Sequence, residues 1–187
     1  TNNWADGINT NYNVDLSVTS GKKVIVAVAV TGGPGIPAVT DIRKGWDFSY
    51  WLSSSTRPTT ADTYTFTVTY SDATTENLSA SVTSVLDSFA NNLTTSGTAN
   101  TPTFNWTAPT TSPASYTYGI SVRRANTGGS IWEYPKDGNI PSTTLTIAYN
   151  ADNDASEATL TSGITYYWQI EVRDSNGNSA TRQASYS

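Results

Sequence analysis

The segment from Leu160 to Val172 reads LTSGITYYWQIEV, and its second half shows the residue pattern that determines the fold class. Aromatic and aliphatic residues occupy every second position of that half: Tyr166, Trp168, Ile170 and Val172. Polar residues stand at Gln169 and Glu171 between them. Because successive side chains of a strand point to opposite faces, this pattern predicts a β-strand with one buried face.

The same two-residue period recurs along the chain, and no stretch of about a dozen residues shows a helical period. The further alternating sets are Tyr12 to Val18, Val24 to Val30, Trp46 to Leu52, Tyr64 to Tyr70, Leu78 to Val82, Phe104 to Trp106, Tyr118 to Val122, Ile131 to Tyr134 and Leu145 to Tyr149. Both faces of the Val24 to Val30 set are apolar, which predicts a central strand covered on both sides. Turn residues separate the strands, as in a β-sandwich. The sequence therefore predicts an all-β protein.

A polar segment divides the predicted strands into two sets. Residues 91–101 read NNLTTSGTANT, with Leu93 as the one large apolar residue, so we expect a linker or a loose lead-in there. Tyr64 to Asp72 and Tyr166 to Asp174 match in alternation, aromatic placement and terminal Asp, which indicates a tandem repeat. We expect domains at residues 1–90 and 91–187, with proteolytic cleavage between Asn91 and Asn100.

The second half resembles a fibronectin type III module. The family signature Leu-x-Pro-x-Thr-x-Tyr-x-Val-x-Val-x-Ala keeps its spacing over Leu160, Ser162, Ile164, Tyr166, Trp168, Ile170 and Val172, although Ser162, Ile164 and Val172 differ from the signature residues. The family's early Trp and Pro match Trp106 and Pro109. The resemblance implies that Trp106 and Leu160 are structural core residues and that Gly163 lies at a corner. It also implies that Tyr166 is the corner tyrosine, whose hydroxyl bonds to the upstream backbone.

The first half resembles a bacterial immunoglobulin-like module through one hairpin, Thr63 to Glu76. Together the two resemblances imply two tandem Ig-like/fibronectin type III-like β-sandwiches, as in the repeats of bacterial secreted and surface proteins. Neither family carries a standard catalytic site, so the resemblance concerns architecture more than activity.

Composition excludes several kinds of chemistry. The 187 residues include no His, Cys or Met, so imidazole bases, thiolate nucleophiles, structural zinc sites and haem ligation are excluded. The net charge of -5 disfavours nucleic acid, and the longest apolar run, Val24 to Val30, is too short to span a membrane. The sequence pattern singles out no pair of catalytic carboxylates and no Ser with an activating base, so we expect neither enzymatic activity nor a cofactor.

Charged side chains receive structural interpretations. The loop Asp152 to Glu157 gathers oxygen ligands as calcium sites do, but its spacing is not that of an EF-hand, and we favour a solvated loop. Arg123 and Arg124 can pair with acidic partners or with Glu171 across a sheet, and the pairing with Glu171 is the commoner one for a surface strand.

Aromatic residues out of phase with the predicted core are the candidate ligand-binding residues. Trp51 alternates with inward residues and is predicted to face outward, as is Tyr167. Trp132 and Tyr134 share one face of a short strand, and the pattern leaves open which face is buried. Such aromatics stack on sugar rings or on partner proteins.

Three functions remain. The first is a non-catalytic spacer, scaffold or adhesion segment of an extracellular or cell-surface bacterial protein, with neighbouring modules of a longer chain or other surface proteins as partners. About 55 Ser and Thr residues against four Lys favour that location. The second is a carbohydrate-binding module that uses the four aromatics, with a polysaccharide as partner. The third is a self-assembling filament or surface-layer subunit, in which Thr1 to Val18 pairs with a neighbour's sheet edge.

Overall fold

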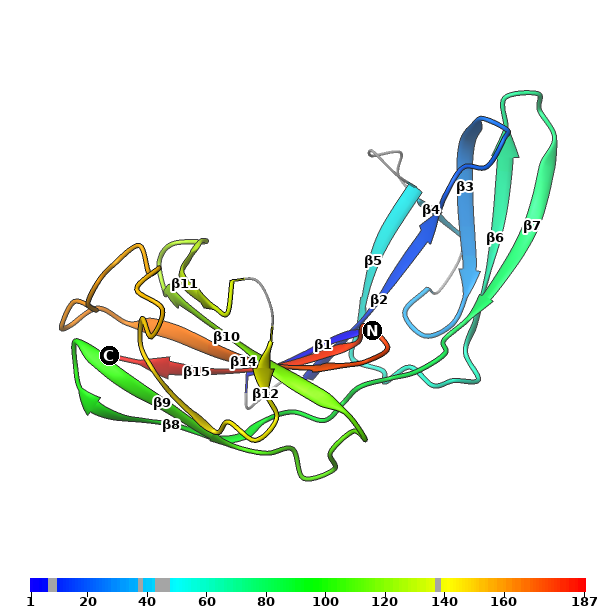
Figure 1. Ribbon diagram of the computed structural model, residues 1–187. Coiled ribbons are helices and arrows are strands. Elements are labelled where there is room, and N and C mark those ends of the chain that lie inside the picture. Colours follow the sequence, from blue (N-terminus) through cyan, green and yellow to red (C-terminus); the bar gives the residue numbers. More distant parts are fainter. Residues whose placement is uncertain (7–9, 37–38, 43–47, 137–138) are drawn as a thin grey trace. The chain divides into compact units, whose positions relative to one another are not determined.

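The computed structural model describes residues 1–6, 10–36, 39–42, 48–136 and 139–187. Strands and turns make up this described part, which confirms the all-β prediction (Figure 1). No helix in it is long and apolar enough to cross a lipid bilayer. The chain divides into two compact units, each with its own hydrophobic core. The first comprises Thr1–Asn2 and Asn11–Val85, and the second comprises Asn3–Thr10 and Leu86–Ser187.

The first unit packs two antiparallel strands against a four-stranded sheet. The pair is β2 (Thr10–Val18) with β5 (Phe48–Ser54). The larger sheet has the order β4 (Thr40–Ile42), β3 (Ile25–Gly32), β6 (Thr63–Tyr70) and β7 (Thr75–Ser81). Inward residues of both layers form one core, which includes Leu16, Leu52, Val28, Val30, Phe66 and Val68. The predicted inward residue Trp46 lies outside the described residues.

Strand β3 differs from its predicted burial pattern. A register shift between Ile25 and Ala27 swaps the two faces, so Ile25 and Val28 are buried while Val26 is exposed. The prediction that both faces of this strand are covered is therefore wrong. The physical reason is a β-bulge, which changes the side-chain parity of a strand without changing its composition.

A close glycine contact locks the start of β6 into this core. Tyr64 is almost completely buried, and Gly33 lies against its ring with a positive φ of 64°. A Cβ at Gly33 would lie 2.2 Å from the ring carbon Cε1 of Tyr64. Only a residue without a side chain fits at this point.

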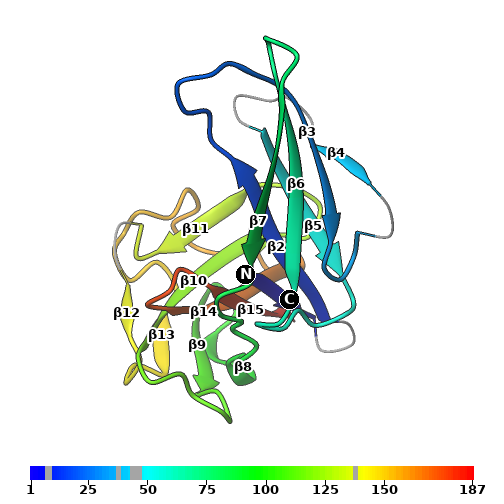
Figure 2. The same cartoon turned by 90° about the vertical axis from the view of Figure 1, so that its right-hand side faces the viewer.

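The second unit is a β-sandwich of two sheets that face each other across a core rich in aromatic residues. The smaller sheet has the order β13 (Thr146–Ala148), β9 (Thr101–Thr107) and β8 (Asn91–Thr98), seen together in Figure 2. The larger sheet has the order β11 (Ser130–Tyr134), β10 (Tyr116–Arg124), β14 (Tyr166–Asp174), β15 (Ser179–Tyr186) and β1 (Asn2–Ala5), with β12 (Ile140–Pro141) also paired to β10. Its core includes Phe104, Trp106, Tyr118, Ile120, Trp168, Ile170 and Val172.

The polar segment after residue 90 is a strand of this sandwich. Residues 91–98 form β8, which is paired with β9, so the prediction of a linker is wrong. The strand is edge-located and mostly exposed, and Leu93 is its one side chain packed against the core. An edge strand needs few apolar residues, which explains why its composition resembles a linker.

The N-terminal residues also group differently from the sequence-based division. That division assigned residues 1–90 to the first domain, whereas residues 3–10 group with the second unit. Strand β1 lies next to β15, and the buried Asn3 donates from Nδ2 to the carbonyl oxygen of Leu86. Strand β1 and strand β2 thus have pairing partners within this chain.

Candidate functional site

Trp132 belongs to the core of the second unit. Its side chain is 2% exposed, and its indole Nε1 donates a 2.8 Å hydrogen bond to the carboxylate of Asp152. Its ring packs edge-on against Tyr149 at a centroid distance of 5.4 Å. The sequence left open which face of this strand is buried, and the structure buries the face that carries Trp132, so this candidate offers no exposed ring for stacking on a ligand.

The other three aromatic candidates differ in accessibility. Tyr134 is half-buried, and its ring stacks on Trp132 at 5.7 Å. Tyr167 is also half-buried, with the guanidinium of Arg123 5.0 Å from its ring centroid. Trp51 is 68% exposed on β5, so it offers the largest open aromatic surface of the four.

Tyr166 anchors the connection that leads into β14. Its ring is 1% exposed, and its hydroxyl accepts a 3.0 Å hydrogen bond from the backbone N–H of Thr161, five residues upstream. The same hydroxyl donates to Oε2 of Glu157 at 3.1 Å. Leu160 is buried, and Gly163 adopts a positive φ of 81° in the turn between them. These contacts hold the turn against the core.

Trp106 occupies the opposite sheet of the same sandwich. Its ring is buried and lies edge-on to Tyr118 at a centroid distance of 5.4 Å. It therefore contributes packing between β9 and β10.

An ion pair that the sequence analysis missed supports the Tyr166 contact. Nε of Arg124 lies 2.6 Å from Oε1 of Glu157, and this contact lowers the pKa of Glu157 against the opposing effect of burial, with help from the Tyr166 hydroxyl. The predicted pairing of Arg124 with Glu171 is wrong, because the register of β10 and β14 places Gly119 opposite Glu171. Arg124 and Glu157 are too far apart in sequence for any local pattern to pair them.

The acidic loop from Asp152 to Glu157 is used for structural contacts. Asp152 accepts from Trp132, and Asp154 lies 3.5 Å from the ammonium of Lys136. The described residues contain no cluster of three side chains suited to metal binding. In this chain the loop carboxylates hold the edge of the sandwich.

A shallow groove lies on the outer face of the larger sheet of the second unit. Its volume is about 210 Å³, and residues of β10, β11, β14 and β15 line it. The polar groups that reach it include Ser121, Glu133, Gln169, Glu171, Arg173 and Thr181, with Tyr134, Pro135 and Lys136 along one side. No pattern in the sequence predicts this groove, because its residues come from four separate strands.

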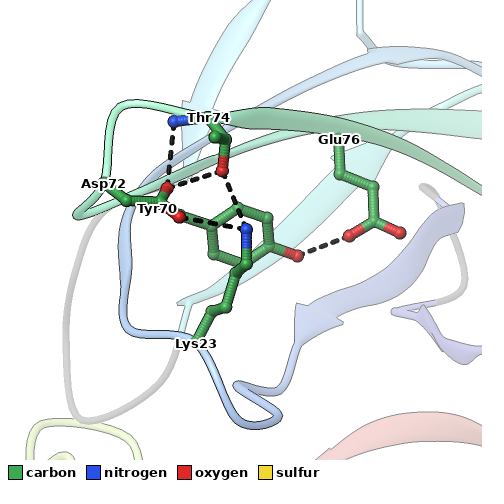
Figure 3. Close-up of polar contacts among 5 residues, drawn as sticks. All are labelled: Lys23, Tyr70, Asp72, Thr74 and Glu76. Atoms are coloured by element: carbon green, nitrogen blue, oxygen red, sulfur yellow. Dashed lines mark hydrogen bonds and ion pairs between the residues drawn. The ribbon is translucent and has the colours of Figure 1, made fainter.

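A polar cluster lies on the hairpin end of the first unit, around Asp72 (Figure 3). Asp72 accepts hydrogen bonds from the hydroxyl and the backbone N–H of Thr74, and its Oδ2 lies 3.0 Å from Nζ of Lys23. These contacts, those of Thr74 first, lower the pKa of Asp72 to about 2. Nζ of Lys23 also lies 5.0 Å from the ring centroid of Tyr70. The hydroxyl of Tyr70 donates a 2.6 Å hydrogen bond to Oε2 of Glu76. Because all five residues are engaged with each other, the cluster closes the hairpin.

Comparisons with known proteins give a structural likeness but no match by sequence. No protein-family model matches the chain, and no curated protein matches it by sequence. Among solved structures, the chain is similar to a two fibronectin type-III domain segment from chicken tenascin, with a TM-score of 0.38 and 14% sequence identity. The alignment covers 92% of this chain and 90% of that chain.

Proposed function

We propose that the chain is a non-catalytic pair of structural modules, a spacer, scaffold or adhesion segment of an extracellular or cell-surface bacterial protein. The observation that carries this proposal is the presence of two separate hydrophobic cores in one short chain. Two units that each bury their own core add length to a longer chain without needing a ligand. Neighbouring modules of a longer chain, or other surface proteins, are the partners that this role requires.

The ionisable groups support a structural role. Among the described residues, the carboxylates with lowered pKa values are Asp72, Glu157 and Asp174, and each is held by neighbours in a turn or loop. Burial opposes the shift at Asp174, but hydrogen bonds from Asn178 and Asn176 outweigh it and lower its pKa. Perturbed pKa values often mark catalytic groups, whereas here they accompany contacts that fasten the backbone.

Composition supports the proposed location. The chain lacks Cys, is rich in Ser and Thr, and carries few Lys, and its edge strand β7 is exposed along its length. A bacterial immunoglobulin-like identity for the first unit rests on its terminal hairpin, β6 and β7, and belongs to the same proposal.

Single-molecule pulling between the chain ends tests the structural role. We expect two cooperative unfolding events, because each unit has its own core. Residues 11–85 of the first unit extend to roughly 26 nm, and residues 3–10 and 86–187 of the second unit together extend to roughly 38 nm, so the two events differ in released length. Tyr166→Phe should lower the force of the longer event only. Extension in one event, or without measurable resistance, would contradict the proposal.

A second candidate function is carbohydrate binding at Trp51, and one observation favours it. The indole is 68% exposed on β5, directly opposite Asp15 of β2, so an aromatic face and a carboxylate lie side by side. Sugar rings stack on such faces while their hydroxyls bond to carboxylates. Glycan-array binding that Trp51→Ala abolishes would support this function, and unchanged binding by that variant would exclude it.

A further inference from the structure

The outer groove of the second unit has a defined chemical character that arises from one glycine. Gly119 stands on β10 opposite Glu171 of β14, in the middle of the larger sheet. Because Gly119 has no side chain, the guanidinium of Arg173 lies directly over it, and a Cβ there would be 3.0 Å from Nη2. Nε and Nη2 of Arg173 donate hydrogen bonds of 2.9 and 2.6 Å to Oε2 of Glu171, which fix the position of the guanidinium. Arg173 therefore forms a fixed, positively charged surface within the groove.

The side chains around this guanidinium include both hydrogen-bond donors and hydrogen-bond acceptors. Glu133 is exposed at the rim, and within the described residues its carboxylate makes no ion pair or hydrogen bond. Gln169 bonds through Nε2 to Gln183 at 2.9 Å, and its Oε1 lies 3.5 Å from the hydroxyl of Ser121. A guanidinium has five N–H donors, of which Glu171 occupies two and Asn139 accepts from a third, on Nη1, at 3.5 Å. The groove thus keeps donors on Arg173 and acceptors on Glu133.

The charge balance of the groove disfavours ionic ligands. Two carboxylates, Glu133 and Glu171, face two cations, Lys136 and Arg173. A phosphate would meet two carboxylates, and a metal cation would meet two positive side chains. An uncharged ligand avoids both repulsions.

The position of the groove also disfavours an extended peptide. Strands β10 and β14 are paired on both sides, so their backbone groups already bond within the sheet. A peptide strand gains most of its affinity from backbone pairing at a sheet edge, which is not offered here. Recognition in this groove therefore depends on side chains alone.

We propose that this groove binds one ring of a neutral oligosaccharide. Sugar hydroxyls both donate and accept, so they bond to the Glu133 carboxylate and to the Arg173 guanidinium at once. A volume of about 210 Å³ is below that of drug-sized pockets and suits a single ring. Pro135 lies along one side of the groove and can cover the apolar face of that ring.

Two-dimensional NMR titration of the full chain tests the proposal with four defined probes: cellobiose, maltose, lactose and N,N′-diacetylchitobiose. We expect at least one probe to shift the backbone amide signals of Gly119, Ser121 and Gln169 in a saturable way. Glu133→Ala should weaken that binding at least tenfold, because a carboxylate contact is lost. Glu133 is exposed, and no described residue pairs with it, so this variant should keep the folded spectrum. Glu76→Ala, which removes a carboxylate from β7 of the first unit, is the matched control and should leave the affinity unchanged.

Three other results of the NMR titration would overturn the inference. Titrations in which no probe shifts these amides would refute it, as would shifts that persist unchanged in Glu133→Ala. Shifts confined to β5 and lost with Trp51→Ala would assign sugar binding to the first unit instead. The pulling experiment is independent of these outcomes, because it measures the cores and not the groove.

Discussion

Replacing Tyr166 with Phe removes one hydroxyl that serves two partners in the second unit. The ring stays buried, so packing is retained, but the backbone N–H of Thr161 loses its acceptor and Glu157 loses one donor. A buried group without a partner costs about 1 to 3 kcal/mol, and Glu157 keeps its bond to Arg124. We expect a loss of about 2 kcal/mol from the free energy of unfolding of the second unit.

Calorimetry and intrinsic fluorescence measure this loss. A change of 1 kcal/mol moves the melting temperature of a unit of this size by about 4 to 8 °C, so Tyr166→Phe should lower the second transition by about 8 to 16 °C. Trp106, Trp132 and Trp168 are buried in this unit and report its unfolding. The transition of the first unit should not move.

Tyr167→Phe is the matched control for this measurement. Tyr167 follows directly in β14 but is only half-buried, and its contact with Arg123 involves the ring and not the hydroxyl. The change should cost less than about 0.5 kcal/mol. Equal effects of the two substitutions, or effects in the reverse order, would show that the hydroxyl of Tyr166 does not hold the turn.

Three further predictions concern both units. Gly33→Ala should destabilise the first unit by about 2 to 4 kcal/mol in urea unfolding, because the new Cβ would overlap the buried Tyr64 ring and residue 33 has a positive φ. Gly21→Ala is the control and should cost far less, because a Cβ at Gly21 would have nothing within 4 Å. Thr74→Val should raise the pKa of Asp72 from about 2 toward 3.8 in an NMR titration of the carboxyl carbon, and an unchanged value would show that the Thr74 hydroxyl does not cause the shift. Acid should destabilise the second unit, because the pKa of Glu157 is lowered in the folded state. The contribution of Glu157 to the free energy of unfolding is complete above its ordinary pKa of 4.5, and it is lost as the pH falls through the lower pKa of the folded state. A melting temperature that stays constant from pH 6 down to about pH 2 would contradict this.

The strand content of this chain is determined by the sequence. The alternation at Tyr166, Trp168, Ile170 and Val172 requires that one face be buried, because the side-chain period of a strand is a local property of the backbone. For the same reason the outward direction of Trp51 follows from its place next to the inward Leu52 of β5, although Tyr50 on its other side is also exposed. Both conclusions can be drawn without information on which strands are neighbours in the sheet.

Pairing and burial at the edges were decided only by the tertiary structure. Residues 91–98 have a linker's composition, yet they form β8 because β9 supplies their hydrogen bonds. Trp132 is buried because its strand turns toward the opposite sheet, and Glu157 binds Arg124 across 33 residues. Four strands line the outer groove, and the neighbouring strands β10 and β14 place Gly119 beneath Arg173. Such contacts depend on register between segments that are distant in sequence, and the local residue pattern carries no information about that register.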